Sequence, residues 1–163
     1  MRDQQGTGLC LTELLVALAL MAVLAGFSVN GGLAMLARQQ VEVASRRLEQ
    51  GLERARAEAV SRGEPCGLSL RPEGWVEPLA GSLPACGAGL SLQEPIDRAQ
   101  VQVVHNLPQT LRFTASGLVL DGGTVVLRAA GTPLQRCLVI ALPLGITRLG
   151  RYQGGVCEAD LAL

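Results

Sequence analysis

The sequence predicts an α+β fold in which one long N-terminal helix packs on a mostly antiparallel β-sheet head. Three observations lead to this prediction: a charge-free run over Leu14–Ala37, a helical pattern that continues to Arg62, and short β-like runs after Pro65. One helix followed by consecutive strands is typical of the α+β class. Of the 163 residues, roughly 100 are left for a single small core once the apolar segment is set aside.

Composition narrows the class of protein. Apolar residues make up 48% of the chain and charged residues 17%, which excludes a disordered protein. Aromatic residues contribute only 2%, so Leu, Val and Ala must fill the core. Basic and acidic residues balance at 14 each, so no overall basic field exists to attract nucleic acid or anionic lipid. This count leaves room for a local basic patch.

The N-terminal residues divide into a polar start and an apolar segment. We expect residues 1–8 (MRDQQGTG), which are short, polar and glycine-containing, to be a leader. Residues 9–37 form the first half of the expected helix. Its charge-free run, Leu14–Ala37, is long enough at about 1.5 Å per residue to cross the ~30 Å hydrocarbon layer of a membrane.

A signal peptide or a generic single-span anchor would give a similar apolar run. Two features argue against these alternatives. Arg2 is offset by Asp3, so the start lacks the usual positive charge. The helical pattern also continues beyond the apolar run instead of stopping there.

Residues 38–63 form the amphipathic half of the helix. Apolar residues recur at spacings of three or four and give one stripe that suits packing on a soluble head: Val41, Ala44, Leu48, Leu52, Ala55 and Ala59. We expect the ion pairs Glu53–Arg56 and Glu58–Arg62 on the other faces. Gly63 and Pro65 then end the helix, which we expect to run from near Leu11 to Arg62.

Residues 64–163 form the β-rich head. The expected strands are Cys66–Leu70, Trp75–Leu79, Val101–His105, Leu111–Thr114, Thr124–Arg128, Cys137–Leu142 and Ile146–Tyr152. Turns are indicated at residues 71–74, 121–123, 131–133 and 143–145, and a surface loop at 80–92. Every connection is too short for a helical crossover, so the strands should pair antiparallel.

The cysteines indicate an oxidising compartment. Cys10 lies at the apolar helix, where we expect it to be a small apolar residue. The other four are Cys66, Cys86, Cys137 and Cys157, and the absence of a C-x-x-C spacing argues against zinc. Four separated cysteines in a small domain suggest two disulfides. Three pairings are open, and we favour Cys66–Cys86 with Cys137–Cys157 because each closes a short loop.

The segment Gly8–Glu13, followed by LLVALALMAVLAGF, is similar to the processing signal of type IV pilins and type II secretion pseudopilins. The resemblance implies that a prepilin peptidase cuts between Gly8 and Leu9 and methylates the amine of Leu9. Glu13 would then be the fifth mature residue. A carboxylate at this place is costly in lipid, and pairing with the new amine of a neighbouring subunit would align and drive assembly.

The helix end Leu52–Gly63 resembles the GspH/FimT branch, as does the hairpin region Cys137–Tyr152 more loosely. The resemblance implies a minor pilin or pseudopilin with a pilin-like fold. Its partners would be other pilins, the prepilin peptidase and the inner-membrane assembly platform. The chain departs from the family at Leu9, where Phe is commoner, and at Asn30, where many members carry a kinking Pro; Gly31–Gly32 offer another place for a kink.

Two indications of topology disagree. Arg38, Arg46 and Arg47 follow the apolar run, which by the positive-inside rule would place the head in the cytoplasm. The resemblance and the head cysteines place it outside, anchored by a single pass in the bacterial inner membrane with the head in the periplasm, and later on a filament or the cell surface. We favour the second location.

Some FimT-like minor pilins capture DNA through a C-terminal Gly-Arg-x-Arg pattern. Here Gly150 and Arg151 match, but Gln153 replaces the second Arg. Arg148, Arg151 and Tyr152 could contact phosphates and stack on a base. A DNA-binding minor pilin for DNA uptake is therefore the alternative function, and a solvated strand end the simpler interpretation of these residues.

Catalysis is not expected. His105 is the only histidine, and it stands at an expected strand end without a nucleophile or carboxylate arranged beside it. No glycine-rich phosphate loop follows a strand. We therefore expect no catalytic residue, no metal ligand and no cofactor.

Overall fold

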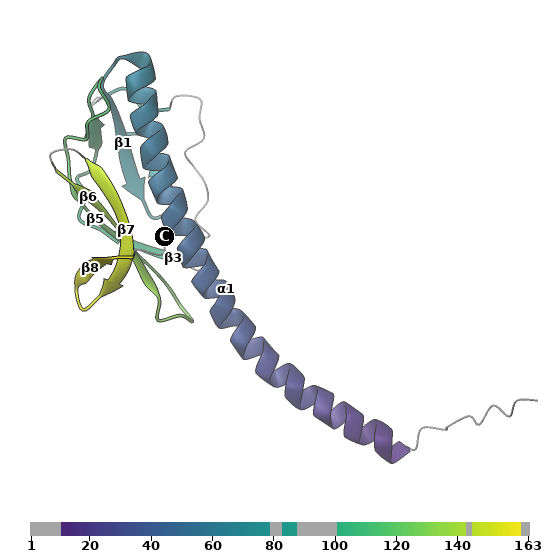
Figure 1. Cartoon of the computed structure of the whole chain (residues 1–163). Helices are drawn as coiled ribbons and strands as arrows, with labels where there is room; N and C mark the ends of the chain where they lie inside the picture. Colours follow the sequence, from purple (N-terminus) through teal and green to yellow (C-terminus); the bar gives the residue numbers. More distant parts are fainter. Residues whose placement is uncertain (1–10, 79–82, 88–100, 143–144, 161–163) are drawn as a thin grey trace, which may run out of the picture.

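The computed structural model describes residues 11–78, 83–87, 101–142 and 145–160; for residues 24–31 it describes the backbone alone. The expected leader, residues 1–8, lies outside these ranges, and so do Leu9 and Cys10. Most of the expected loop 80–92 also lies outside them. One long helix, α1 (Leu11–Arg62), leads into a β-rich head, and its first half projects from that head (Figure 1). Its bounds are those predicted. At about 1.5 Å per residue, its 52 residues span roughly 78 Å.

The head contains two antiparallel sheets where we expected one. The strands are β1 (Cys66–Arg71), β2 (Gly74–Val76), β3 (Val101–His105), β4 (Leu111–Phe113), β5 (Gly123–Ala129), β6 (Gln135–Ala141), β7 (Ile146–Gln153) and β8 (Val156–Ala159). The smaller sheet has the order β2-β1-β4 and the larger one β3-β5-β6-β7-β8. All paired strands run antiparallel, as predicted.

Two strand predictions were wrong. β2 was expected to reach Leu79 but ends at Val76, two residues before Pro78, which has no N–H to donate to a ladder. β8 was not predicted: the last expected strand ended at Tyr152. Gly154 and Gly155 adopt positive φ and turn β7 directly back into β8.

The second half of α1 covers the head with the predicted apolar stripe. All six stripe residues are buried, and Val41, Leu52 and Ala59 are fully so. They pack with the inner faces of both sheets, including Leu68, Phe113 and Leu138.

Trp75 joins the smaller sheet to this helix. Its indole Nε1 donates a hydrogen bond of 2.8 Å to the carbonyl of Leu48. The ring lies against Gly51, where an added Cβ would stand 2.3 Å from the indole Cδ1. The helix therefore carries a glycine at the place where the tryptophan crosses it, and Trp75 is a packing residue.

Candidate assembly helix and head surface

The first half of α1 leaves large apolar side chains uncovered. Leu11 is 75% exposed and Met21 66% exposed, and similar side chains occur on every side of this half: Leu14, Leu15, Val16, Leu18, Leu20, Val23, Leu33, Met35 and Leu36. A helix that is apolar all round is normally buried in protein or lipid. This half of α1 therefore needs a surrounding that the chain's own head does not supply.

The expected membrane span was residues 14–37. Within the residues that the structure describes, no helix is long and apolar enough to cross a membrane. The side chains of residues 24–31, inside the expected span, are not among those described.

Glu13 lies in the first turn of α1, where a carboxylate interacts favourably with the positive end of the helix dipole. Together with Thr12, Val16, Ala17 and Leu20 it lines a shallow depression of about 350 Å³. The carboxylate therefore stands at the start of the apolar surface, as the sequence predicted. The structure does not describe Gly8 and Leu9, so cleavage and the pairing of Glu13 with a new amine stay predictions.

Both favoured disulfides are present in the head. Cys66 is bonded to Cys86 and Cys137 to Cys157, each pair being 20 residues apart. The first ties β1 to the segment at Ala85, which itself pairs with Gly67. The second ties β6 to β8, which are not neighbours in the sheet, because β7 lies between them.

Gly150 makes the second disulfide feasible. In β7 it faces Cys137 on one side and Ala159 on the other. A Cβ at Gly150 would stand 2.2 Å from the carbonyl oxygen of Glu158 and 3.2 Å from the sulfur of Cys157. A side chain here would push β8 away from β6. The close packing of β8 therefore explains the glycine at position 150, without a role in DNA binding.

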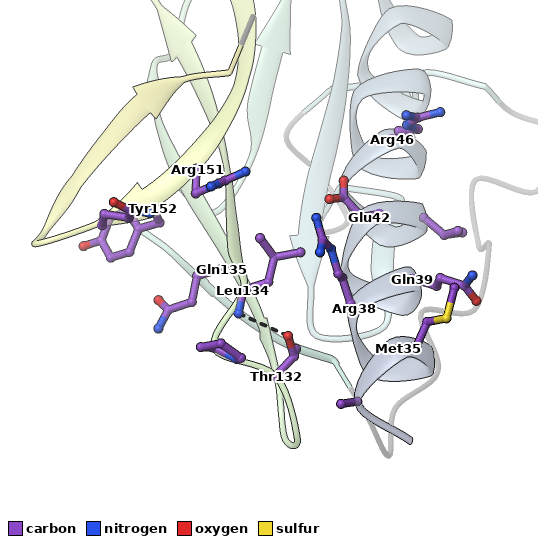
Figure 2. Close-up of a pocket in the computed structure, with 14 residues that line it drawn as sticks. Met35, Arg38, Gln39, Glu42, Arg46, Thr132, Leu134, Gln135, Arg151 and Tyr152 are labelled. Atoms are coloured by element: carbon purple, nitrogen blue, oxygen red, sulfur yellow. Dashed lines mark hydrogen bonds between the residues drawn. The ribbon is translucent and has the colours of Figure 1, made fainter. Parts of the chain in front are cut away.

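The structure does not bring the proposed DNA-contacting residues together. Successive side chains of a strand alternate between its faces, so Arg148 and Arg151 project from opposite faces of β7. Thr147, on the Arg151 face, donates a 3.4 Å hydrogen bond to Glu53 of α1, so this is the face toward the helix. Figure 2 shows Arg151 directed toward α1 and Tyr152 directed away. Arg151 also lies 3.5 Å from Asp160.

A buried arginine that was not among the predicted site residues joins three parts of the chain. Arg136 of β6 is only 4% exposed. Its Nε donates to Glu42 Oε2 of α1 at 3.0 Å, and its Nη1 donates to Asp160 Oδ2 at 2.6 Å. Burial alone would lower the pKa of Arg136, but the hydrogen bonds to the two carboxylates outweigh burial and raise it. An Arg inside the apolar strand QRCLVIA was the available signal, because a buried charge requires partners.

Exposed ion pairs brace the helix and one loop. The predicted pairs Glu53–Arg56 and Glu58–Arg62 are present, at 3.1 and 2.6 Å. Arg112 of β4 holds Asp121 through two side-chain hydrogen bonds and its backbone N–H. These bonds to Arg112 hold the pKa of Asp121 below its ordinary value of 3.8.

His105 is exposed at the end of β3, and the described residues contain no His, Cys, Asp or Glu cluster suited to a metal.

A comparison with protein-family models matches the middle of the chain. The family model described as type II transport protein GspH matches residues 44–143, from the buried face of α1 through the end of β6. Searches of the curated proteins and of the solved structures found no match.

Proposed function

The chain belongs to the type II transport protein GspH family, and is at family level a type II secretion pseudopilin or minor pilin. From this family membership we propose that the uncovered half of α1 anchors the protein in the inner membrane and later packs it into a filament. Such a filament subunit needs one surface that can be exchanged between lipid and neighbouring helices. Its assembly partners would be other pseudopilins. The proposal includes no catalytic activity and no cofactor.

The observation that carries the proposal is the contrast along α1. Large apolar side chains from Leu11 to Leu36 are exposed, while the stripe from Val41 to Ala59 is buried on the head. Burial releases roughly 25 cal/mol for each Å² of apolar surface, so an uncovered stretch of this size would be strongly driven into lipid or against other helices. The head keeps its own core in either surrounding.

Processing is the first step that the proposal requires. A prepilin peptidase would cut between Gly8 and Leu9 and methylate Leu9, leaving Glu13 as the fifth mature residue. The test is mass spectrometry of the N-terminus after co-expression with a prepilin peptidase. An N-methylated Leu9 is expected, whereas an intact Met1, or a cut inside the apolar run, would contradict the proposal.

Assembly is the second step. The Glu13 carboxylate would pair with the amine of Leu9 in a neighbouring subunit, next to the assembly platform in the inner membrane. Glu13→Gln keeps the shape and removes the charge, so it should lower crosslinking to co-expressed pseudopilins without changing membrane insertion. Glu77→Gln, on the exposed side of the head, is the matched control. Equal crosslinking by both variants would refute the role of Glu13.

Location is the third part of the proposal. We place the head in the periplasm, and the two disulfides support this because such bonds persist in oxidising compartments. Intact cells are treated with a thiol-alkylating reagent before the protein is denatured. Mass spectrometry should then show none of the four head cysteines alkylated. The DNA-uptake alternative is not favoured, because Arg148 and Arg151 project from opposite faces of β7.

A further inference from the structure

A groove opens between α1 and the large sheet at the end of the head nearest the uncovered helix. Its volume is about 1060 Å³. One wall is the helix face from Ala34 to Arg46, and the other is formed by residues 132–135 and 151–153 (Figure 2). A 3.2 Å hydrogen bond from the N–H of Leu134 to the hydroxyl of Thr132 fixes the turn before β6.

The groove carries a local positive charge that the balanced composition conceals. Arg38, Arg46 and Arg151 line it, and among the lining residues Glu42 is the sole carboxylate. Glu42 lies one turn beyond Arg38 but is bound by the buried Arg136. Within the described ranges, Arg38 has no ion-pair partner, while Arg46 is attracted by Glu49 one turn further on. Arg151 lies 3.5 Å from Asp160, which is also bound by Arg136.

Apolar side chains also line the groove, two of them on the N-terminal side of Arg38 in α1. Ala34, Met35 and Val43 line the helix wall, and Pro133 and Leu134 face them. Met35 is 63% exposed. Arg38 follows it by three residues, or about 4.5 Å along the helix axis. A polar headgroup layer is roughly 5–7 Å thick on each side of the hydrocarbon core. The order of apolar and cationic side chains therefore follows the order of acyl chain and phosphate in a phospholipid.

We propose that this groove binds an anionic phospholipid in the leaflet next to the head, with its phosphate between Arg38 and Arg151 and an acyl chain against Met35 and Leu134. The inference rests on the proposed membrane anchorage, since a lipid reaches this place only if the apolar half of α1 is inserted. Two arginines on opposite walls suit a phosphate because each guanidinium can donate to a separate oxygen. An acidic peptide could pair with the arginines but would leave the apolar side chains of Met35 and Leu134 without a partner.

Native mass spectrometry of the full chain in neutral detergent tests the proposal by counting bound lipids. Phosphatidylglycerol should bind roughly 10- to 30-fold more tightly than phosphatidylcholine, as expected for two basic residues at an anionic headgroup. Arg38→Gln combined with Arg151→Gln should abolish this preference. The matched control removes the same charge elsewhere on the head: Arg71→Gln with Arg128→Gln, both exposed. Trp75 fluorescence checks that each variant is folded.

Each outcome decides the proposal. Loss of the preference in the groove variant alone supports it. No preference in the unaltered chain, or the same loss in the control, overturns it. Full competition by hexaglutamate would assign the groove to an acidic peptide, and full competition by inorganic phosphate at equal concentration would assign it to a free anion; both overturn the lipid assignment. Flotation with pure phosphatidylcholine vesicles tests the anchor separately, because neutral vesicles engage the apolar helix and not the arginines.

Discussion

The two halves of α1 have the same backbone conformation and opposite surroundings. From Ala37 onward one stripe of the helix is buried on the head, whereas the described side chains before it are exposed on all sides. An isolated helix gains little stability from its backbone alone, so tertiary contacts stabilise most protein helices. The second half therefore depends on the head, and the first half depends on whatever surrounds it. Substitutions in the two halves should accordingly have different consequences.

The largest difference is expected for truncated leucines. Leu52→Ala should lower the free energy of unfolding of the head by about 2–5 kcal/mol, because Leu52 is fully buried and leaves a cavity. Leu18→Ala, at a side chain that is 55% exposed, should change it by less than about 0.5 kcal/mol. Urea denaturation of the full chain in detergent, followed by the fluorescence of the single Trp75, measures both. Equal losses would mean that the two halves do not differ in their dependence on the head.

Removal of the β6–β8 disulfide should come next. Cys137→Ala with Cys157→Ala should cost the head about 3 kcal/mol, the value expected for a closed loop of this size. Far-ultraviolet circular dichroism in detergent should still report the uncovered helix after the head has unfolded. Cys66→Ala with Cys86→Ala, which removes a disulfide of the same 20-residue separation, is the comparison. A double variant as stable as the unaltered chain would exclude a structural role for that bond.

Substitutions of two glycines, one in each half of α1, should have smaller effects on stability and of opposite sign. Gly51→Ala should destabilise the head by about 1–3 kcal/mol, because the new methyl group overlaps the Trp75 ring. Gly32→Ala meets nothing within 4 Å and should favour the helix by up to about 1 kcal/mol. Trp75 emission during thermal unfolding measures the first effect, and far-ultraviolet circular dichroism in detergent measures the second. A neutral Gly51→Ala would show that the indole moves aside freely.

The smallest effect is expected from acid. Since the pKa of Asp121 lies below 3.8 in the folded head, its pairing with Arg112 stabilises the head fully above that value. The stabilisation is lost as the pH falls through the lower folded pKa. Arg112→Gln should therefore reduce the drop in Tm between pH 5 and pH 2.5. The charge-free residues 14–37 should keep their helicity over the same pH range. A loss of helicity there together with the drop in Tm would contradict the proposed difference between the two halves of α1.

Local patterns predicted most of the fold. The helix bounds and all six stripe residues followed from periodicity, capping and the Gly63–Pro65 stop. The division into two sheets did not follow, because strand partners depend on contacts between distant segments. β8 was missed for the same reason: Val156–Ala159 is short and mostly exposed, and pairs with β7 only once Gly154 and Gly155 have reversed the chain.

The surface was harder to predict than the fold. The groove combines Arg38 and Arg46 with Arg151, which is more than 100 residues away in the chain, so no local pattern could place them together. In contrast, the separation of Arg148 from Arg151 was predictable. Two residues three positions apart in a strand lie on opposite faces, and the sequence analysis grouped them without applying that period.

Strand β8 also has a consequence for the order of events during folding. Cys157 and Asp160 reach back to β6, although they follow it by about 20 residues. In a chain that emerges from its N-terminus they appear after α1 and β6, which they fasten. The head can therefore be closed only after residues 157–160 have become available to fold back on β6. A chain truncated before residue 157 would keep its long helix and lack this closure.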